Sequence, residues 1–222
     1  MNKTLLLIIP LLEVILVRFK FIEICIKPLN TLIHELSHAL VALILGNKVK
    51  EIKINTDYSG SCTTAGKSKV KQFFISIAGY TLPAILGFLI IKFLGGEHQI
   101  YFFYILIFIN IIALILYIRN SFGIIWTIVF ILLNLCFIYF PFFTEYHEYI
   151  LYTYACIILL ENIISTLILV KINFSNSKKA GDSTILEKTT HIPAIIYSLA
   201  FFAFSIWLTY KAYTIILFRY FQ

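Results

Sequence analysis

The chain has 222 residues, of which 60% are hydrophobic and only 13% are charged, and its formal net charge is +7. An ordinary soluble domain carries about 25% charged residues, and a disordered chain combines low hydrophobicity with high charge. Four cysteines are too few for a small disulfide scaffold. The composition therefore excludes these three classes and predicts an all-α polytopic membrane protein that forms a single domain over residues 1–222.

Long apolar runs predict the membrane spans, because a helix needs about 20 apolar residues to cross a bilayer. The first run, residues 4–17, is short and contains Glu13, and the second, residues 28–46, contains two histidines and a glutamate. Five later runs contain at most one charged residue each. These five runs are residues 73–96, 101–118, 121–144, 149–170 and 192–210. The sequence thus predicts a bundle of six or seven transmembrane helices.

Basic residues occur in alternate loops between these spans. Six lysines lie in residues 47–71, Arg119 lies in a short loop, and four lysines lie in residues 171–191, whereas the loops at 96–99 and 145–148 contain no lysine or arginine. Because lysine and arginine favour the cytoplasmic side, we expect the basic loops to be cytoplasmic and to meet anionic lipid. The chain shows no arginine-rich, aromatic-interleaved pattern, so we expect no nucleic-acid partner.

The second run contains the pattern His34-Glu35-Leu36-Ser37-His38, which reads H-E-x-x-H. Residues four apart share one face of a helix, so His34 and His38 can offer two imidazole nitrogens to one metal ion. Glu35 can reach a water molecule on that ion as a general base. This arrangement is typical of zinc metallopeptidases and predicts Zn2+ as the cofactor. The alternative is an interfacial helix whose histidines are merely solvated.

A catalytic zinc site needs a third protein ligand and an open position for water. Asp182 follows Ala180-Gly181 in a basic loop, on the same predicted membrane side as the carboxyl end of the histidine helix. Its alternative role is an N-cap on the next helix. Glu161 is the rival ligand, because it lies within an apolar span, where its alternative role is that of a protonated acid bonded to a neighbouring helix.

These residues resemble the site-2 protease family of intramembrane zinc metallopeptidases, and most of all its compact bacterial branch. The resemblance covers roughly residues 28–210. It rests on four segments in order, which are His34–His38 with Gly46, the turn Asp57-Tyr58-Ser59-Gly60, Ala78-Gly79-Tyr80 with Pro83 and Gly87, and Gly181-Asp182-Ser183 with Trp207. In better-known members a glycine follows the aspartate, whereas here Ser183 does.

The resemblance implies zinc on His34, His38 and Asp182, with Glu35 as the catalytic acid and base. It also implies a multi-pass protein of the bacterial cell membrane that hydrolyses peptide bonds of membrane-spanning or membrane-associated substrates. One alternative is a catalytically silent relative that serves as a membrane scaffold or binds a partner. Another is a metal transporter, but transporters often contain an internal repeat, and the H-E-x-x-H pattern occurs once.

Residues 48–61 alternate polar and apolar side chains, which predicts a strand followed by a turn at Ser59-Gly60. A substrate helix hides its carbonyl groups in its own hydrogen bonds and must unwind before hydrolysis. An open strand edge can hold the unwound segment by strand addition. We therefore expect Ile52, Ile54 and Gly60 to contribute to substrate binding. The alternative is a solvated basic linker.

Overall fold

The computed structural model describes residues 3–17, 19–66, 68–96, 99–176 and 180–221. The elements follow one another as α1 (Lys3–Leu16), α2 (Lys20–Ile44), β1 (Lys48–Ile54), β2 (Gly60–Ala65), α3 (Lys69–Phe93), α4 (Gln99–Leu116), α5 (Ser121–Tyr139), the short 3-10 helix η1 (Pro141–Tyr146), α6 (His147–Asn176), α7 (Asp182–Thr190) and α8 (Ala194–Phe221). Three lysines of the basic loops, Lys67, Lys178 and Lys179, lie outside the described residues.

The architecture confirms an all-α polytopic membrane protein with a small hairpin after the histidine helix. Within the described residues, five helical segments are long and apolar enough to cross a membrane, namely α3, α4, α5, Pro141–Ser175 and α8. They correspond to the five uninterrupted runs of the sequence. At 1.5 Å per residue, the 14 residues of α1 extend about 21 Å, which is less than the roughly 30 Å of bilayer hydrocarbon. The 25 residues of α2 are long enough to cross, but charged side chains interrupt them.

The last helix extends further than the sequence predicts. The expected span 192–210 ends before Lys211, whereas α8 continues to Phe221. Arg219, in its last turn, donates hydrogen bonds to the carbonyl groups of Leu94 and Lys92, where α3 ends. Lys211 therefore ends the apolar run but not the helix, and the guanidinium of Arg219 further along satisfies carbonyl groups at the carboxyl end of α3.

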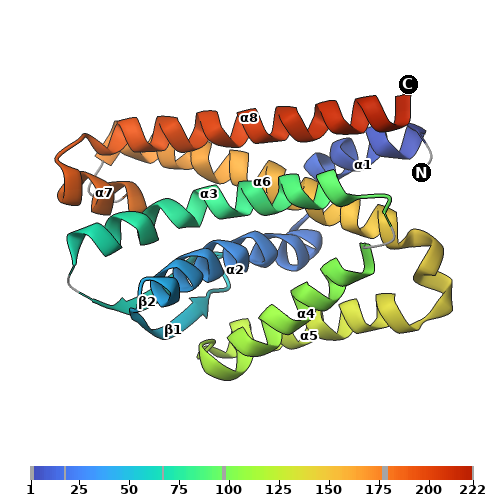
Figure 1. Ribbon diagram of the computed structural model, residues 1–222, viewed down its shortest axis with the longest axis horizontal. Helices are drawn as coiled ribbons and strands as arrows, with labels where there is room; N and C mark the ends of the chain where they lie inside the picture. Colours follow the sequence, from blue (N-terminus) through green and yellow to red (C-terminus); the bar gives the residue numbers. More distant parts are fainter. Residues whose placement is uncertain (1–2, 18, 67, 97–98, 177–179, 222) are drawn as a thin grey trace.

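The long helices lie roughly parallel to the long axis of the molecule (Figure 1). The helices α3, α6 and α8 pack against one another, α2 packs against α3, and α4 and α5 form an antiparallel pair on the other side of α2. The hairpin, the α4–α5 connection and α7 all lie at one end of the bundle (Figure 1). The three basic segments of the sequence therefore share one end, as a membrane weave requires.

The β1–β2 hairpin is held at this end by the loop between α4 and α5. Ile52 of β1 donates its N–H to the carbonyl of Tyr117 at 2.8 Å and accepts from the N–H of Arg119 at 3.2 Å. The side chain of Asn120 bonds both backbone groups of Ile54. The outer edge of β1 is thus covered, whereas no backbone–backbone hydrogen bond joins the outer edge of β2 to another described residue.

The turn of the hairpin is fixed on α2. Asp57 accepts hydrogen bonds from the hydroxyl and the N–H of Ser59 at 2.6 and 3.0 Å, and these bonds hold the pKa of Asp57 below its ordinary value. The hydroxyl of Thr31 donates to the carbonyl of Tyr58 at 2.7 Å, and the ammonium of Lys27 lies 5.4 Å from the centre of the Tyr58 ring. The hairpin therefore rests on the helix that carries the H-E-x-x-H motif.

Candidate metal centre

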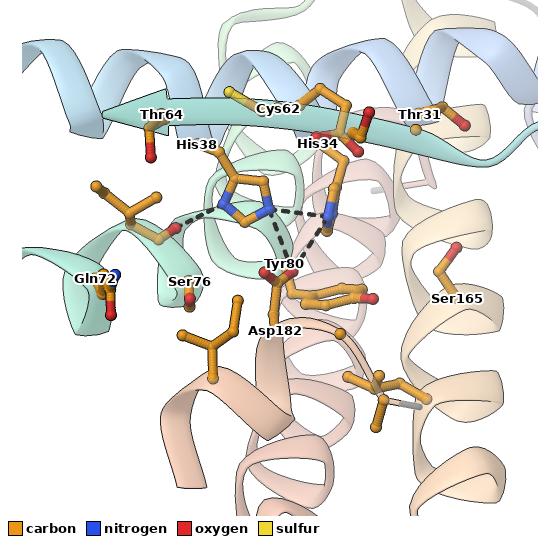
Figure 2. Close-up of a pocket in the computed structure, with 18 of the residues that line it drawn as sticks. Thr31, His34, His38, Cys62, Thr64, Gln72, Ser76, Tyr80, Ser165 and Asp182 are labelled. Carbon is orange, nitrogen blue, oxygen red and sulfur yellow. Dashed lines mark hydrogen bonds and ion pairs between the residues drawn. The ribbon is translucent and has the colours of Figure 1, made fainter. Parts of the chain in front are cut away.

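A cavity of about 720 Å³ lies between α2, β2, α3, α6 and α7. Figure 2 shows that the strand β2 crosses over it and that His34, His38 and Asp182 lie near its middle. Several of its lining residues carry hydroxyl, amide or thiol groups. Among those labelled in Figure 2, Thr31 and Ser165 lie on one side of the two histidines, and Thr64, Gln72 and Ser76 lie on the other. The cavity therefore contains many polar groups although apolar helices surround it.

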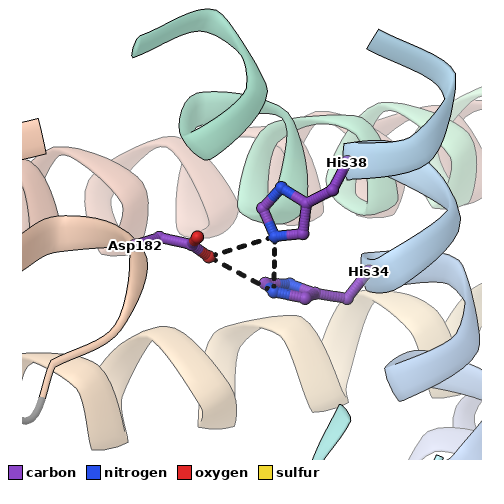
Figure 3. A group of neighbouring side chains, drawn as sticks. All are labelled: His34, His38 and Asp182. Carbon is purple, nitrogen blue, oxygen red and sulfur yellow. Dashed lines mark hydrogen bonds and ion pairs between the residues drawn. The ribbon is translucent and has the colours of Figure 1, made fainter. Parts of the chain in front are cut away.

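His34 and His38 lie one turn apart on the same face of α2, and their Nε2 atoms are 3.1 Å apart. Asp182, the first residue of α7, directs its carboxylate between them (Figure 3). Its Oδ2 atom lies 3.3 Å from Nε2 of His34 and 3.2 Å from Nε2 of His38. The structure thus brings together the two histidines and the aspartate that the sequence singled out.

Asp182 is ionised, which is the form in which a carboxylate binds a metal. Burial opposes its ionisation, but the adjacent His38 and His34 and the hydrogen bonds from both rings hold the pKa of Asp182 well below its usual range. Cys62 of β2 also lines the cavity. Burial, with a further contribution from the charges of Glu35 and Asp182, raises the pKa of Cys62 to about 12. Its thiol is therefore protonated at neutral pH, and its sulfur does not belong to the group of converging ligand atoms.

The three side chains fit a zinc ion. Ligands at 2.0–2.1 Å in a tetrahedron are separated from one another by about 3.3 Å. The observed separations are 3.1, 3.2 and 3.3 Å. Within the part of the chain that the structure describes, this is the group of His, Cys, Asp and Glu whose ligand atoms converge closely enough for one ion. Two imidazole nitrogens and a carboxylate oxygen are also a donor set that catalytic zinc sites use.

Helix α3 holds the histidines in this orientation. The Nδ1 atom of His38 lies 2.7 Å from the carbonyl of Ile75 and donates to it, so Nδ1 stays protonated and Nε2 is the nitrogen that can give up its proton to bind a metal. Gly79 lies against both rings, because a Cβ at this position would be 2.5 Å from the His38 ring and 2.6 Å from the His34 ring. The ring of Tyr80 meets the His34 ring edge to face, with centroids 4.6 Å apart. A residue larger than glycine at position 79 would displace the ligands.

Glu35 is buried, with 5% of its surface exposed, and lines the same cavity. Its carboxylate lies against the first residue of β2, where a Cβ on Gly60 would be 2.4 Å from Oε1 of Glu35. The backbone of the hairpin and the carboxylate are therefore in direct contact, which only glycine at position 60 permits. This contact places an acid and a strand next to the three ligand atoms.

Of the remaining predicted site residues, one lines the cavity and three do not. Glu161 is buried on α6 and does not belong to the three-residue group. Ile52 and Ile54 are fully buried and pack with Leu32 and Ala39 of α2, so their side chains face the core and do not line the cavity. Gly60 does line it.

The cavity also contains residues to which the sequence analysis assigned no role, among them Asn30 on α2 and Ser165 on α6. Asn30 precedes His34 by four residues, so helical spacing could have placed it on the same face. Ser165 gives no comparable signal in the sequence, because only the packing of α6 against α2 brings it to the cavity.

The fold and the site define a class: a multi-pass membrane protein that carries an H-E-x-x-H helix at a cavity within its helical bundle. The model of the Peptidase M50B-like family matches residues 7–212, so the chain belongs to this family. This match confirms the resemblance to site-2 proteases. Comparison with curated proteins and comparison with solved structures found no match.

We expect Gly79→Ala to weaken zinc binding by about 10- to 100-fold, because the added methyl group displaces both imidazoles from their shared position. The matched control is Gly87→Ala on the same helix, where the methyl group would meet Leu159 instead of the histidines. Zinc affinity of the purified full chain, measured by competition with a chelator, checks the prediction. Equal affinities for the two variants would contradict it.

Proposed function

We propose that the protein is a zinc-dependent intramembrane endopeptidase. The observation that carries this proposal is the placement of Glu35 beside three converging ligand atoms in one cavity of a membrane-embedded bundle. Membership of the Peptidase M50B-like family supports it. Its substrates are membrane-spanning or membrane-associated proteins, because the cavity lies among helices that are apolar enough for lipid.

In this proposal His34, His38 and Asp182 hold the zinc ion. When bound, zinc lowers the pKa of a coordinated water and polarises a carbonyl group. Glu35 takes a proton from the attacking water and passes it to the amine that leaves when the peptide bond breaks. Its contact with Gly60 keeps this carboxylate at the cavity wall, and burial excludes competing bulk water from it.

The outer edge of β2 holds the substrate as an added strand. In an antiparallel pair, residues directly opposite each other point their N–H and C=O groups either toward or away from the partner strand together. Ile52 and Ile54 bond away from β2, to residues 117–120. Their partners Cys62 and Gly60 therefore point their backbone groups away from β1, toward the open edge. Ile52 and Ile54 contribute by anchoring the hairpin, and Gly60 contributes at the edge itself.

The orientation follows from charge. The basic loops share one end of the bundle, and we place this end in the cytoplasm of a bacterial cell. The site then lies close to the cytoplasmic side of the membrane, since α7 and the hairpin are at the same end. A silent scaffold of the same shape is the alternative, but such a protein has no need of a carboxylate at position 35.

Substitution of each acid tests whether Asp182 or Glu161 is the third zinc ligand. We expect Asp182→Asn to lower zinc affinity by at least tenfold, because the anionic oxygen between the two imidazoles is replaced by a neutral amide. Glu161→Gln, a matched change of another buried acid, leaves zinc affinity unchanged. Metal analysis of both purified variants checks this, and a larger loss in Glu161→Gln would contradict the assignment.

Glu35→Gln tests the chemistry. We expect it to retain zinc, because Glu35 is not one of the three ligands, and to lose about 10²- to 10⁴-fold in cleavage rate, because an amide cannot accept the proton. Cleavage of a membrane-spanning reporter substrate by the reconstituted protein is the measurement. Unchanged cleavage would remove Glu35 from the mechanism, and absence of cleavage by the unchanged protein on a panel of such substrates would favour the scaffold.

Cys62→Pro tests the strand edge. Proline removes the outward N–H of β2 without removing a bond of the hairpin ladder, so we expect substrate cleavage to fall by about tenfold or more while zinc binding is retained. Cys62→Ala keeps the N–H and serves as the control for loss of the thiol. If the two variants cleave equally, substrate does not pair with this edge.

A further inference from the structure

Asn30 is a buried amide in the wall of the metal cavity. It lies four residues before His34 on α2, with 8% of its surface exposed, and it lines the cavity. Its Nδ2 atom donates to the hydroxyl of Ser165 on α6, at 3.4 Å. Its Oδ1 atom has no hydrogen-bond partner among the described residues. A buried amide oxygen without a donor is unfavourable, so this oxygen fits a donor other than those that the described residues supply.

The proposed substrate presents such donors. An extended peptide directs its N–H and C=O groups alternately to its two edges. The groups on one edge pair with β2, and the groups on the other edge face the helical side of the cavity, where α6 and α2 contribute Ser165 and Asn30. Without hydrogen-bond partners these backbone groups of the substrate would oppose binding, because they give up their hydrogen bonds to water on entering the cavity.

We propose that Asn30 and Ser165 form a peptide-binding subsite, in which Oδ1 of Asn30 accepts a hydrogen bond from a backbone N–H of the substrate. The subsite deepens the proposed function and rests on it. Ser165 orients the amide through the bond to Nδ2. Asn30 is thus a residue that positions the substrate strand, and it takes no part in proton transfer.

The spacing of α2 fixes which N–H is bound. Asn30 precedes His34 by one helical turn, which is about 6 Å along the axis. An extended chain advances about 3.3 Å per residue. The bound N–H therefore belongs to a residue about two positions from the peptide bond that is cleaved. The subsite lies on the side of the metal ligands where Figure 2 shows Ser165, opposite Ser76.

The test is a cycle that combines a change in the protein with a change in the ligand. The probes are short peptide hydroxamates, whose hydroxamate group binds zinc, in two series that extend the peptide to either side of that group. Each probe is made with a free or an N-methylated amide two residues from the hydroxamate. Dissociation constants are measured with the full-length, zinc-loaded protein in detergent and with Asn30→Ala.

In one of the two series, we expect N-methylation to weaken binding to the unchanged protein by about tenfold and to Asn30→Ala by less than about twofold. Ser76→Ala, a cavity serine on the other side of the histidines, keeps the full effect of methylation. An equal effect of methylation in the unchanged protein and in Asn30→Ala, in both series, overturns the subsite. In that case tight hydroxamate binding still upholds the metal centre. If the unchanged protein binds no hydroxamate, the metal centre fails, and the subsite fails with it.

Discussion

The separations of about 3.2 Å between one carboxylate oxygen and two imidazole nitrogens constrain most of this structure. Polar and ionised groups are costly within a membrane protein unless they compensate one another. Here the carboxylate on α7 compensates the two imidazole rings on α2. Helix α3 approaches these rings so closely at Gly79 that no side chain larger than glycine fits there. The carbonyl of Ile75 then fixes which nitrogen of His38 faces the carboxylate.

In the proposed enzyme the hairpin addresses a second problem, which is that an intact substrate helix offers no free carbonyl group for hydrolysis. β1 is bonded on both edges, to β2 and to residues 117–120, so it acts as a fixed support. β2 is bonded on one edge only and runs beside the metal ligands (Figure 2). The pair α4–α5, which contributes no side chain to the cavity, therefore matters to the site through the support that it gives to the strand.

Local patterns made part of this site predictable. The H-E-x-x-H motif needs only one turn of helix, and the apolar runs located the five long spans, because both signals depend on neighbouring residues. The choice between Asp182 and Glu161 depends on how distant helices pack, which spacing alone does not specify. Strand alternation likewise located the hairpin but not its buried face, so the side chains of Ile52 and Ile54 lie in the core and not at the cavity. The length of α8 was missed because Lys211 ends the apolar run in the sequence, whereas the helix continues past this charge to Phe221.

The origin of Asp182 from a short helix near the end of the chain has a consequence for biosynthesis. Ribosomes deliver α2 early, whereas α7 emerges after five further helical segments have been made. Until then the two imidazoles lack their anionic neighbour, and a nascent chain cannot assemble the complete cluster. In the proposed enzyme, the order of synthesis thus leaves the metal site incomplete until α7 has been made.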